Sequence, residues 1–330
     1  MRLRYIDYTK GFAIILILFG HTMIEINFVH LWIYSFHMPL FFIVDGILIA
    51  ERAHNSGESC ENIVFKRWKS VGIPYFCFGI MLAVFYALLN IVANESLSLR
   101  YNMWKLLTFQ GIDSLWFLPV YAFADIIMKA VERFEKEEKY IRLAIAILSI
   151  IILSTFHVEN ISWYEDLFCK TLLGICFIEI GFLISQFSLN KINSVIISSV
   201  LLALGFILAF FNGPVEMAVF NIGNPMIYFI SATATSVAVL NIFRKLEDKQ
   251  WRLIEIIETF GKNSIVLVCT NNLLIESIRL LDYKLTGNVL CSLKNIGSII
   301  FTVILLLLEW QIIILANGCL TPLFGREKVK

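Results

Sequence analysis

The chain has 330 residues, of which 58% are hydrophobic and 16% are charged, and its formal net charge is +1. A soluble domain has roughly 25% charged residues, so this composition excludes a polar, water-facing surface over most of the chain. Without a concentrated basic face, we expect no nucleic-acid partner. The seven cysteines show no CxxC or Cys/His spacing, so we expect neither a metal nor a structural disulfide.

Apolar runs of about 20 residues, the length needed to cross a hydrocarbon core of roughly 30 Å, recur along the whole sequence. They predict an all-α, polytopic transmembrane bundle, a single domain over residues 1–330 in contact with membrane lipids. We expect about ten spans, between nine and eleven, because the fourth and fifth are short and interrupted. The predicted spans are 8–29, 31–50, 71–93, 114–131, 141–157, 166–185, 192–211, 225–243, 263–281 and 291–316.

The basic residues predict the orientation of these spans, because Lys and Arg are in excess in cytoplasmic loops. With the N-terminus inside, the inner segments hold 21 of the 27 Lys and Arg residues and the outer segments hold the other six. Both termini are therefore predicted to be cytoplasmic.

The first span contains an ionisable residue where a lipid-facing side chain would be costly. His21 lies eleven residues beyond Lys10, or about 16 Å deeper along a helix, which predicts a position near mid-membrane. At about 100° per residue, Asp7, Lys10 and His21 share one stripe of the helix. This stripe indicates either a path from the cytoplasm to a functional imidazole, or an interfacial ion pair with a hydrogen-bonded packing histidine.

The second span contains His37, Pro39 and Asp45. Running inward, His37 reaches a depth comparable with that of His21, so the two histidines are predicted to face each other in adjacent helices. Pro39 removes a backbone donor and bends the helix, so His37 is either functional or a polar residue that stabilises the kink. Asp45 lies nearer the inner face, where it would pair with Lys10 or be hydrated.

Lys66, Arg67 and Lys69 form a basic cluster before the third span. Such a cluster usually reports a cytoplasmic loop, but it also supplies the partners that a phosphorylated donor needs. Trp116 stands at the start of the fourth span, where a tryptophan usually belongs to the aromatic belt of the outer interface.

Taken together, these segments resemble the membrane acyltransferase-3 family, the O- and N-acyltransferases that modify cell-surface sugars. Asp7-Tyr-Thr-Lys10 followed after ten residues by His21 is similar to the opening of the family, and His37-Met-Pro-Leu-Phe-Phe to its second-span sequence. Asp45 stands where the family has a serine. Lys66, Arg67 and Pro74 resemble its basic segment, although Lys69 and Ser70 replace a clean second arginine.

Two later segments extend the resemblance over most of the chain. Leu115-Trp-Phe-Leu-Pro119 is similar to a family segment, and Gly261-Lys-Asn-Ser264 is similar to another. About ten residues after the second, where the family often has a histidine, this chain has Asn271.

The resemblance implies a multi-pass enzyme of the bacterial inner membrane, with acetyl-coenzyme A as donor and a glycan or lipid-linked saccharide as acceptor. His21 would act as general base or as transient acyl carrier, with Asp7 and His37 as further candidate catalytic residues. Lys10, Lys66, Arg67 and Lys69 are the candidate donor-binding residues. Trp116, Asp45 and Asn271 are the candidate acceptor-binding residues.

Two other functions fit the same residues. Intramembrane His and Asp side chains also suit a proton-coupled transporter or flippase of lipid-linked sugars. A sensory or scaffolding membrane protein would use them only to pack helices.

Overall fold

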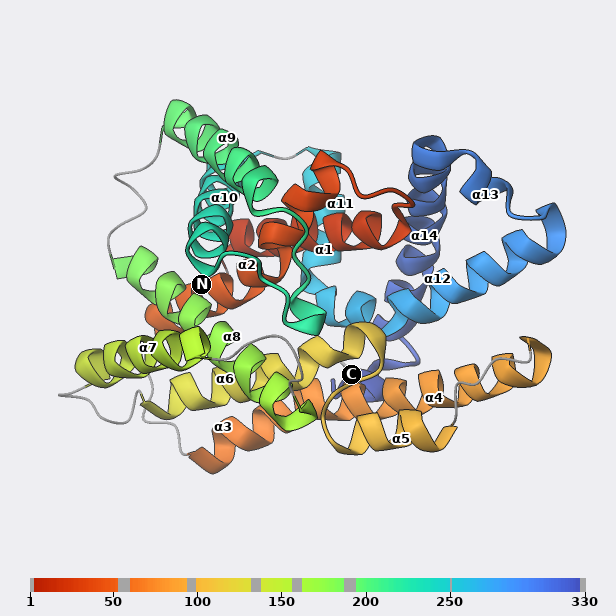
Figure 1. Cartoon of the computed structure of the whole chain (residues 1–330), viewed down its shortest axis with the longest axis horizontal. Helices are drawn as coiled ribbons and strands as arrows, with labels where there is room; N and C mark the ends of the chain where they lie inside the picture. The colour runs from red at the N-terminus through yellow and green to blue at the C-terminus, as the bar shows by residue number, and fades with distance from the viewer. Residues whose placement is uncertain are drawn as a thin grey trace. The chain divides into compact units, whose positions relative to one another are not determined.

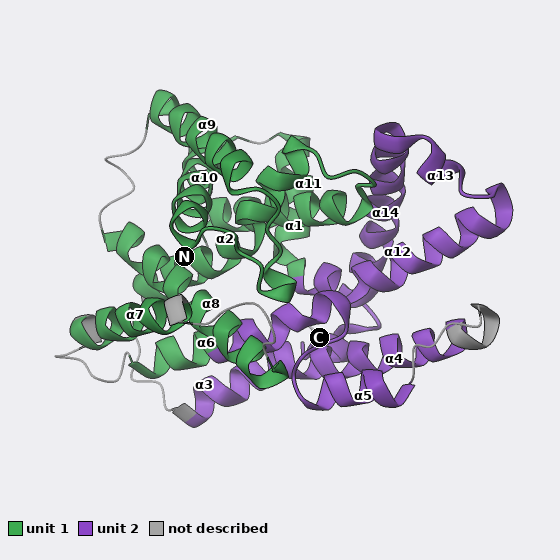
Figure 2. Ribbon diagram, in the orientation of Figure 1, with its two compact units in different colours: residues 1–58, 124–264 green, residues 59–123, 265–330 purple. Residues whose placement is uncertain are grey.

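The computed structural model describes residues 3–52, 60–93, 99–131, 138–155, 162–186, 194–249 and 251–326. The described residues are helical apart from turns and one isolated antiparallel bridge between Glu216 and Asn221. The chain divides into two compact units, residues 1–58 with 124–264 and residues 59–123 with 265–330 (Figure 2).

Unit 1 is built mainly from long helices, and its α-helices are labelled in Figure 1. They are α1 (Arg4–Thr22), α2 (Phe28–Arg52), α7 (Glu138–Thr155), α8 (Trp163–Gln186), α9 (Val195–Asn212), the short η4 (Met217–Val219), α10 (Pro225–Lys245) and α11 (Arg252–Lys262). Helix α6 (Phe117–Val131) begins in unit 2 and ends in unit 1.

Glycine contacts set how closely the unit 1 helices pack. Lipid tails are as apolar as leucine, so membrane helices associate where small residues let their backbones approach. A Cβ at Gly46 of α2 would collide with the carbonyl oxygen of Ile178 in α8, and one at Gly181 of α8 with that of Ile43. Helices α2 and α8 are therefore held backbone to backbone.

The same kind of contact joins α1 to α11. A Cβ at Gly11 would collide with the carbonyl oxygen of Ile257, and one at Gly261 would collide with that of Asp7. Arg4 adds an ion pair of 2.8 Å to Glu258, which also pairs with Lys262 at 2.5 Å. The beginning of α1 is thus fixed by both shape and charge.

Unit 2 contains a long helical rod and a second group of helices. The rod runs from α3 (Cys60–Arg67) through the π-helical segment η1 (Trp68–Gly72) into α4 (Ile73–Ala93). The other elements are α5 (Leu99–Leu107), the 3-10 turn η2 (Asp113–Trp116), α12 (Ser264–Thr286), α13 (Val289–Ser292), α14 (Lys294–Asn317) and η5 (Thr321–Phe324). Tyr75 of α4 donates a hydrogen bond of 2.9 Å to the carbonyl of Leu106, which fixes α5 to the rod.

Among the described residues, eight helices are long and apolar enough to cross a membrane. They are α2, the α3–α4 rod, η2 with α6, α8, α9, α10, α12 and α14. Eight of the ten predicted spans fall on them, whereas α1 does not meet the same measure and the apolar part of α7 is shorter, Tyr140–Leu153. Residues 156 and 157 of the fifth predicted span, and residues 192 and 193 of the seventh, lie outside the described residues. The all-helical membrane fold is confirmed, and the number of spans and the side of the termini stay predictions.

The first predicted span is wrong at its end. Helix α1 stops at Thr22, and residues 23–27 turn before α2 begins at Phe28. His21 therefore lies in the last turn of a helix, rather than in the middle of the span 8–29.

Candidate functional site

Three histidines of unit 1 surround the ring of Tyr34, near the connection between α1 and α2. The ring centroid of Tyr34 lies 6.4 Å from that of His21, 5.0 Å from that of His37 and 4.0 Å from that of His30. The His21 and His37 rings meet Tyr34 edge-on, and the His30 ring stacks on it. We call these four residues the tyrosine–histidine cluster.

The backbone brings the two helices of this cluster close together. A Cβ at Gly20, the residue before His21, would lie 2.9 Å from Cε2 of Tyr34. A side chain at position 20 would therefore push the ring away, so the glycine allows α1 to present His21 to α2.

His37 is held in one orientation by its own helix. Its Nδ1 lies 2.7 Å from the carbonyl oxygen of Ile33, four residues earlier, and its side chain is buried. A carbonyl only accepts hydrogen bonds, so the hydrogen of this bond belongs to Nδ1. In the neutral ring, Nε2 then carries the lone pair and is the atom that can accept a proton.

The other three side chains of the cluster are partly exposed at the surface of unit 1. His21, His30 and Tyr34 are half-buried, in contrast to the buried His37. A molecule that approaches this end of α1 and α2 can therefore reach their rings. Among the described residues, no group of three His, Cys, Asp or Glu side chains is arranged to hold a metal ion.

The segment between α9 and α10, residues 213–224, also belongs to this region. Its Glu216 is exposed, and its backbone pairs with that of Asn221 in an isolated antiparallel bridge. The carbonyl of Ala218 accepts a hydrogen bond from the buried ammonium of Lys170 in α8. The segment is thus tied to α8 and carries an exposed carboxylate.

The other predicted residues of unit 1 lie elsewhere on the same two helices. Asp7 is buried and Lys10 half-buried in the first turns of α1, whereas His21 ends that helix. Asp45 is buried in α2, directly before the glycine that packs on α8. The structure therefore joins His21 to His37 through Tyr34.

The basic cluster before the third predicted span, Lys66, Arg67 and Lys69, belongs to unit 2. Lys66 is exposed and Arg67 half-buried at the end of α3, and Lys69 is half-buried in η1. The guanidinium carbon of Arg67 lies 5.0 Å from the ring centroid of Tyr121, within the range of a cation–π contact.

Trp116 and Asn271 lie in unit 2 as well, and both are buried. Burial argues against Trp116 as a belt residue that faces the interface. Ser114, two residues before Trp116, places its hydroxyl oxygen 2.7 Å from Oδ1 of Asn271 and 2.9 Å from the carbonyl oxygen of Val268. The turn η2 is therefore pinned to α12 by Ser114.

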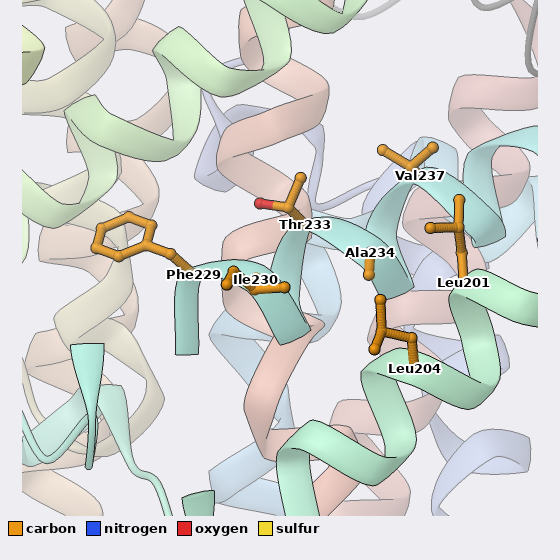
Figure 3. A pocket seen from close by; sticks show the side chains of 7 residues that line it. All are labelled: Leu201, Leu204, Phe229, Ile230, Thr233, Ala234 and Val237. Carbon is orange, nitrogen blue, oxygen red and sulfur yellow. The ribbon is translucent and has the colours of Figure 1, made fainter. Parts of the chain in front are cut away.

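A separate pocket of about 490 Å³ lies between α9 and α10 and contains none of the predicted residues (Figure 3). The side chains that line it are Leu201, Leu204, Phe229, Ile230, Thr233, Ala234 and Val237. Its exposed lining is apolar, so it offers a place for a lipid tail but no group for acid–base chemistry.

Sequence reasoning missed His30 and Tyr34 of the cluster, and it missed Ser114, the hydrogen-bond partner of Asn271. His30, Tyr34 and His37 are spaced by four and three residues, which places them on one face of a helix. That spacing was a usable signal. No feature of the sequence links Ser114 to Asn271, because the contact joins segments that are far apart in the chain.

Comparison with known proteins gives one family. A family model described as an acyltransferase domain matches residues 3–314, nearly the whole chain. No curated protein and no solved structure matches the sequence.

Proposed function

The chain belongs to the acyltransferase-3 family, and from that premise we propose that it moves an acyl group from a cytoplasmic coenzyme A thioester to a hydroxyl of a glycan. Acetyl is the acyl group we favour, and the acceptor is a cell-surface or lipid-linked saccharide at the bacterial inner membrane. The observation that supports this most is the tyrosine–histidine cluster, with two histidines on adjacent helices of a multi-pass membrane protein.

The chemistry needs a base and a leaving group. A histidine nitrogen takes the proton of the acceptor hydroxyl as the oxygen attacks the thioester carbonyl carbon. The carbon–sulfur bond then breaks, and the thiolate leaves with the proton returned by the imidazolium. The products are an ester and free coenzyme A, so atoms and charge balance.

The same residues support a second route to these products. The unprotonated nitrogen of the neutral His21 ring attacks the thioester carbonyl carbon and expels the thiolate, which takes the ring's N–H proton and leaves as free coenzyme A. His21 then holds the acyl group as an acyl-imidazole. The acceptor hydroxyl attacks the acyl carbon while His37 takes the hydroxyl proton through Nε2, and that proton returns to the His21 ring as it leaves, with Asp7 balancing charge along α1. This route lets the donor leave before the acceptor reacts.

Donor binding calls for cations, because coenzyme A carries several phosphate charges. Lys66, Arg67 and Lys69 supply them on one helical rod, and an Arg or Lys bond to a phosphate oxygen is among the stronger hydrogen bonds of proteins. We assign Lys10 to the same task, and Trp116, Asp45 and Asn271 to contact with the acceptor.

The test is transfer of label in membranes. Inside-out vesicles from cells that express the full chain are incubated with acetyl-coenzyme A labelled in the acetyl group, and label in the glycan fraction is counted. The wild-type chain should transfer label, and His21→Ala should reduce transfer by roughly a hundredfold or more, the scale of a lost acid–base group.

Leu16→Ala, which shortens a half-exposed side chain of the same helix, is the matched control and should keep the wild-type rate. Movement of lipid-linked sugar with no transfer of label would overturn the proposal in favour of a transporter. Transfer at the wild-type rate in His21→Ala would overturn the role of this histidine.

A further inference from the structure

Tyr34 lies against both of the histidines to which the proposed chemistry is assigned, yet that chemistry gives it no part. Its ring centroid is 6.4 Å from that of His21 on α1 and 5.0 Å from that of His37 on its own helix. Both contacts are edge-on, at interplanar angles of 80° and 74°, and both distances fall in the range of about 4.5–7 Å that aromatic pairs favour. A movement of the Tyr34 ring would therefore disturb both histidines.

His21 depends on this contact more than His37 does. The side chain of His37 is buried and its Nδ1 is bonded to the carbonyl oxygen of Ile33, so its own helix already orients it. His21 is half-buried in the last turn of α1, and the helix ends one residue later at Thr22. Because the ends of helices fray, a ring at this place needs a neighbour on another helix to keep one orientation.

The Tyr34 ring is itself held on two sides. The ring of His30, four residues earlier on α2, stacks on it with centroids 4.0 Å apart and an interplanar angle of 19°. The spacing of four residues places His30 and Tyr34 on one face of the helix, so the stack is built into α2. On the side of α1, a Cβ added at Gly20 would lie 2.9 Å from Cε2 of Tyr34, so the ring occupies space that a side chain would need.

We propose that Tyr34 is a positioning residue that sets the distance and orientation of His21 relative to His37, and that His30 holds the Tyr34 ring by stacking. The inference rests on the proposed acyl transfer, in which the two imidazoles act on the same reacting groups. A displacement of about 1 Å in such a pair can lower a rate about a hundredfold. The ring, rather than the hydroxyl, has this role, because the ring makes the contacts with the three histidines.

Two substitutions of Tyr34 in the full chain, assayed in vesicles with labelled acetyl-coenzyme A as the probe, separate the ring from the hydroxyl. Tyr34→Leu removes the ring and should lower kcat for transfer by about tenfold to a hundredfold. The KM for acetyl-coenzyme A should stay at the wild-type value, because the residues assigned to donor binding lie outside the cluster. Tyr34→Phe keeps the ring and should recover most of the lost rate.

Phe28→Leu is the matched control, because it removes an exposed aromatic ring of the same helix outside the cluster. It should transfer label as the wild-type chain does. An equal loss of rate in Tyr34→Phe and Tyr34→Leu would overturn the positioning role, since the hydroxyl would then be the group that matters.

Gly20→Ala moves the ring without removing it. The added methyl group meets Cε2 of Tyr34, the far end of a side chain that can turn aside, so the two helices need not separate. The unfolding temperature should therefore stay at the wild-type value, whereas transfer should fall by about tenfold. A structural role alone predicts the reverse, with a lowered unfolding temperature and a normal rate for each folded molecule.

Substitutions of His30 test the stack. Its buried Nδ1 has no hydrogen-bond partner among the residues that the structure describes, which makes an acid–base role the alternative to stacking. His30→Ala removes the stacked ring and should slow transfer, and His30→Phe keeps an aromatic ring and should recover most of the rate. If both variants are equally slow, a nitrogen of His30 acts in the reaction and the stacking role is overturned.

Failure of this inference differs from failure of the proposed function. Wild-type transfer in both Tyr34→Leu and Gly20→Ala would overturn the inference and leave the proposed function standing. A wild-type chain that transfers no label would overturn the proposed function itself.

Discussion

The two ends of α1 differ in what holds them. The first half packs its backbone on α11 through Gly11 and Gly261, and Arg4 pairs with Glu258. The last turn instead places His21 half-buried against the ring of Tyr34. One end of the helix is fixed by close contact and charge, and the other presents a reactive ring to a partner.

Along this helix, the residues that stabilise the fold are therefore separate from those we assign to the chemistry. Changes at the α11 end should alter how much folded protein exists, with a normal rate for each folded molecule. Changes at the Tyr34 end should alter the rate of transfer in a protein that is normally folded. Substitutions at each end of the helix test the two sides of that division.

We expect the largest change, a loss of acyl-transfer activity, on substitution of His37. Replacing it by Gln keeps a polar side chain of similar size but removes the basic Nε2, so transfer of label should fall by about 100- to 10,000-fold. The unfolding temperature should stay close to that of the wild-type chain. Ser35→Ala, a buried neighbour on α2, is the control and should transfer normally. A normal rate in His37→Gln would show that this imidazole takes no part in the chemistry.

We expect a smaller change, a loss of stability, on substitution at the contact between α1 and α11. Gly261→Ala places a methyl group against the carbonyl oxygen of Asp7, and backbone atoms there cannot move aside without separating the helices. We expect a loss of about 3 kcal/mol in the free energy of unfolding, the upper end for an overpacked contact. This loss of stability is followed by heating the protein mildly in detergent and comparing, between the variant and the wild-type chain, the fraction that still elutes as a single species.

Gly318→Ala is the matched control, because the nearest atom to its added methyl group is the carbonyl oxygen of Ile314, 3.3 Å away. It should behave as the wild-type chain does. If Gly261→Ala is equally stable, the backbone contact is not what fixes α1 to α11.

We expect the smallest change, again in stability, on substitution of Glu258. Burial of its carboxyl opposes ionisation, but hydrogen bonds from Arg4 and Lys262 outweigh burial and lower its pKa below the ordinary value of 4.5. A lowered pKa in the folded state gives stability that is present above pH 4.5 and is lost as the pH falls through the folded value.

Glu258→Gln should therefore be less stable than the wild-type chain by roughly 1 kcal/mol near neutral pH. The difference in unfolding temperature between the two proteins should narrow below about pH 4 as the wild-type carboxyl takes up its proton. A difference that is the same at pH 3 and pH 7 would exclude this ion pair as its cause.

Sequence reasoning predicted most of the helices, because hydropathy and length together report which segments are apolar enough to cross a membrane. Span 225–243 corresponds to Pro225–Lys245, and span 31–50 to Phe28–Arg52. It failed at the end of α1, where Ile24 and Ile26 continue the apolar run although both are exposed in a turn. An average over a window does not detect a turn made of apolar residues.

The candidate site likewise has residues that the sequence predicts and contacts that it does not. A titratable residue in an apolar helix is visible in sequence, so His21 and His37 were found. The contact of Ser114 with Asn271 depends on how two distant segments pack, and no local pattern reports it. The tautomer of His37 likewise depends on the helical turn that brings the Ile33 carbonyl to Nδ1.

The π-helical segment η1 has a consequence for the basic residues that precede it. A π turn accommodates one extra residue within a helix, and one residue corresponds to about 100° of rotation about the axis. The direction in which Lys66 and Arg67 point, relative to α4, is thus set by the number of residues in η1. A homologue shortened by one residue here would keep its composition and its helices, yet turn its cations to another side of the rod.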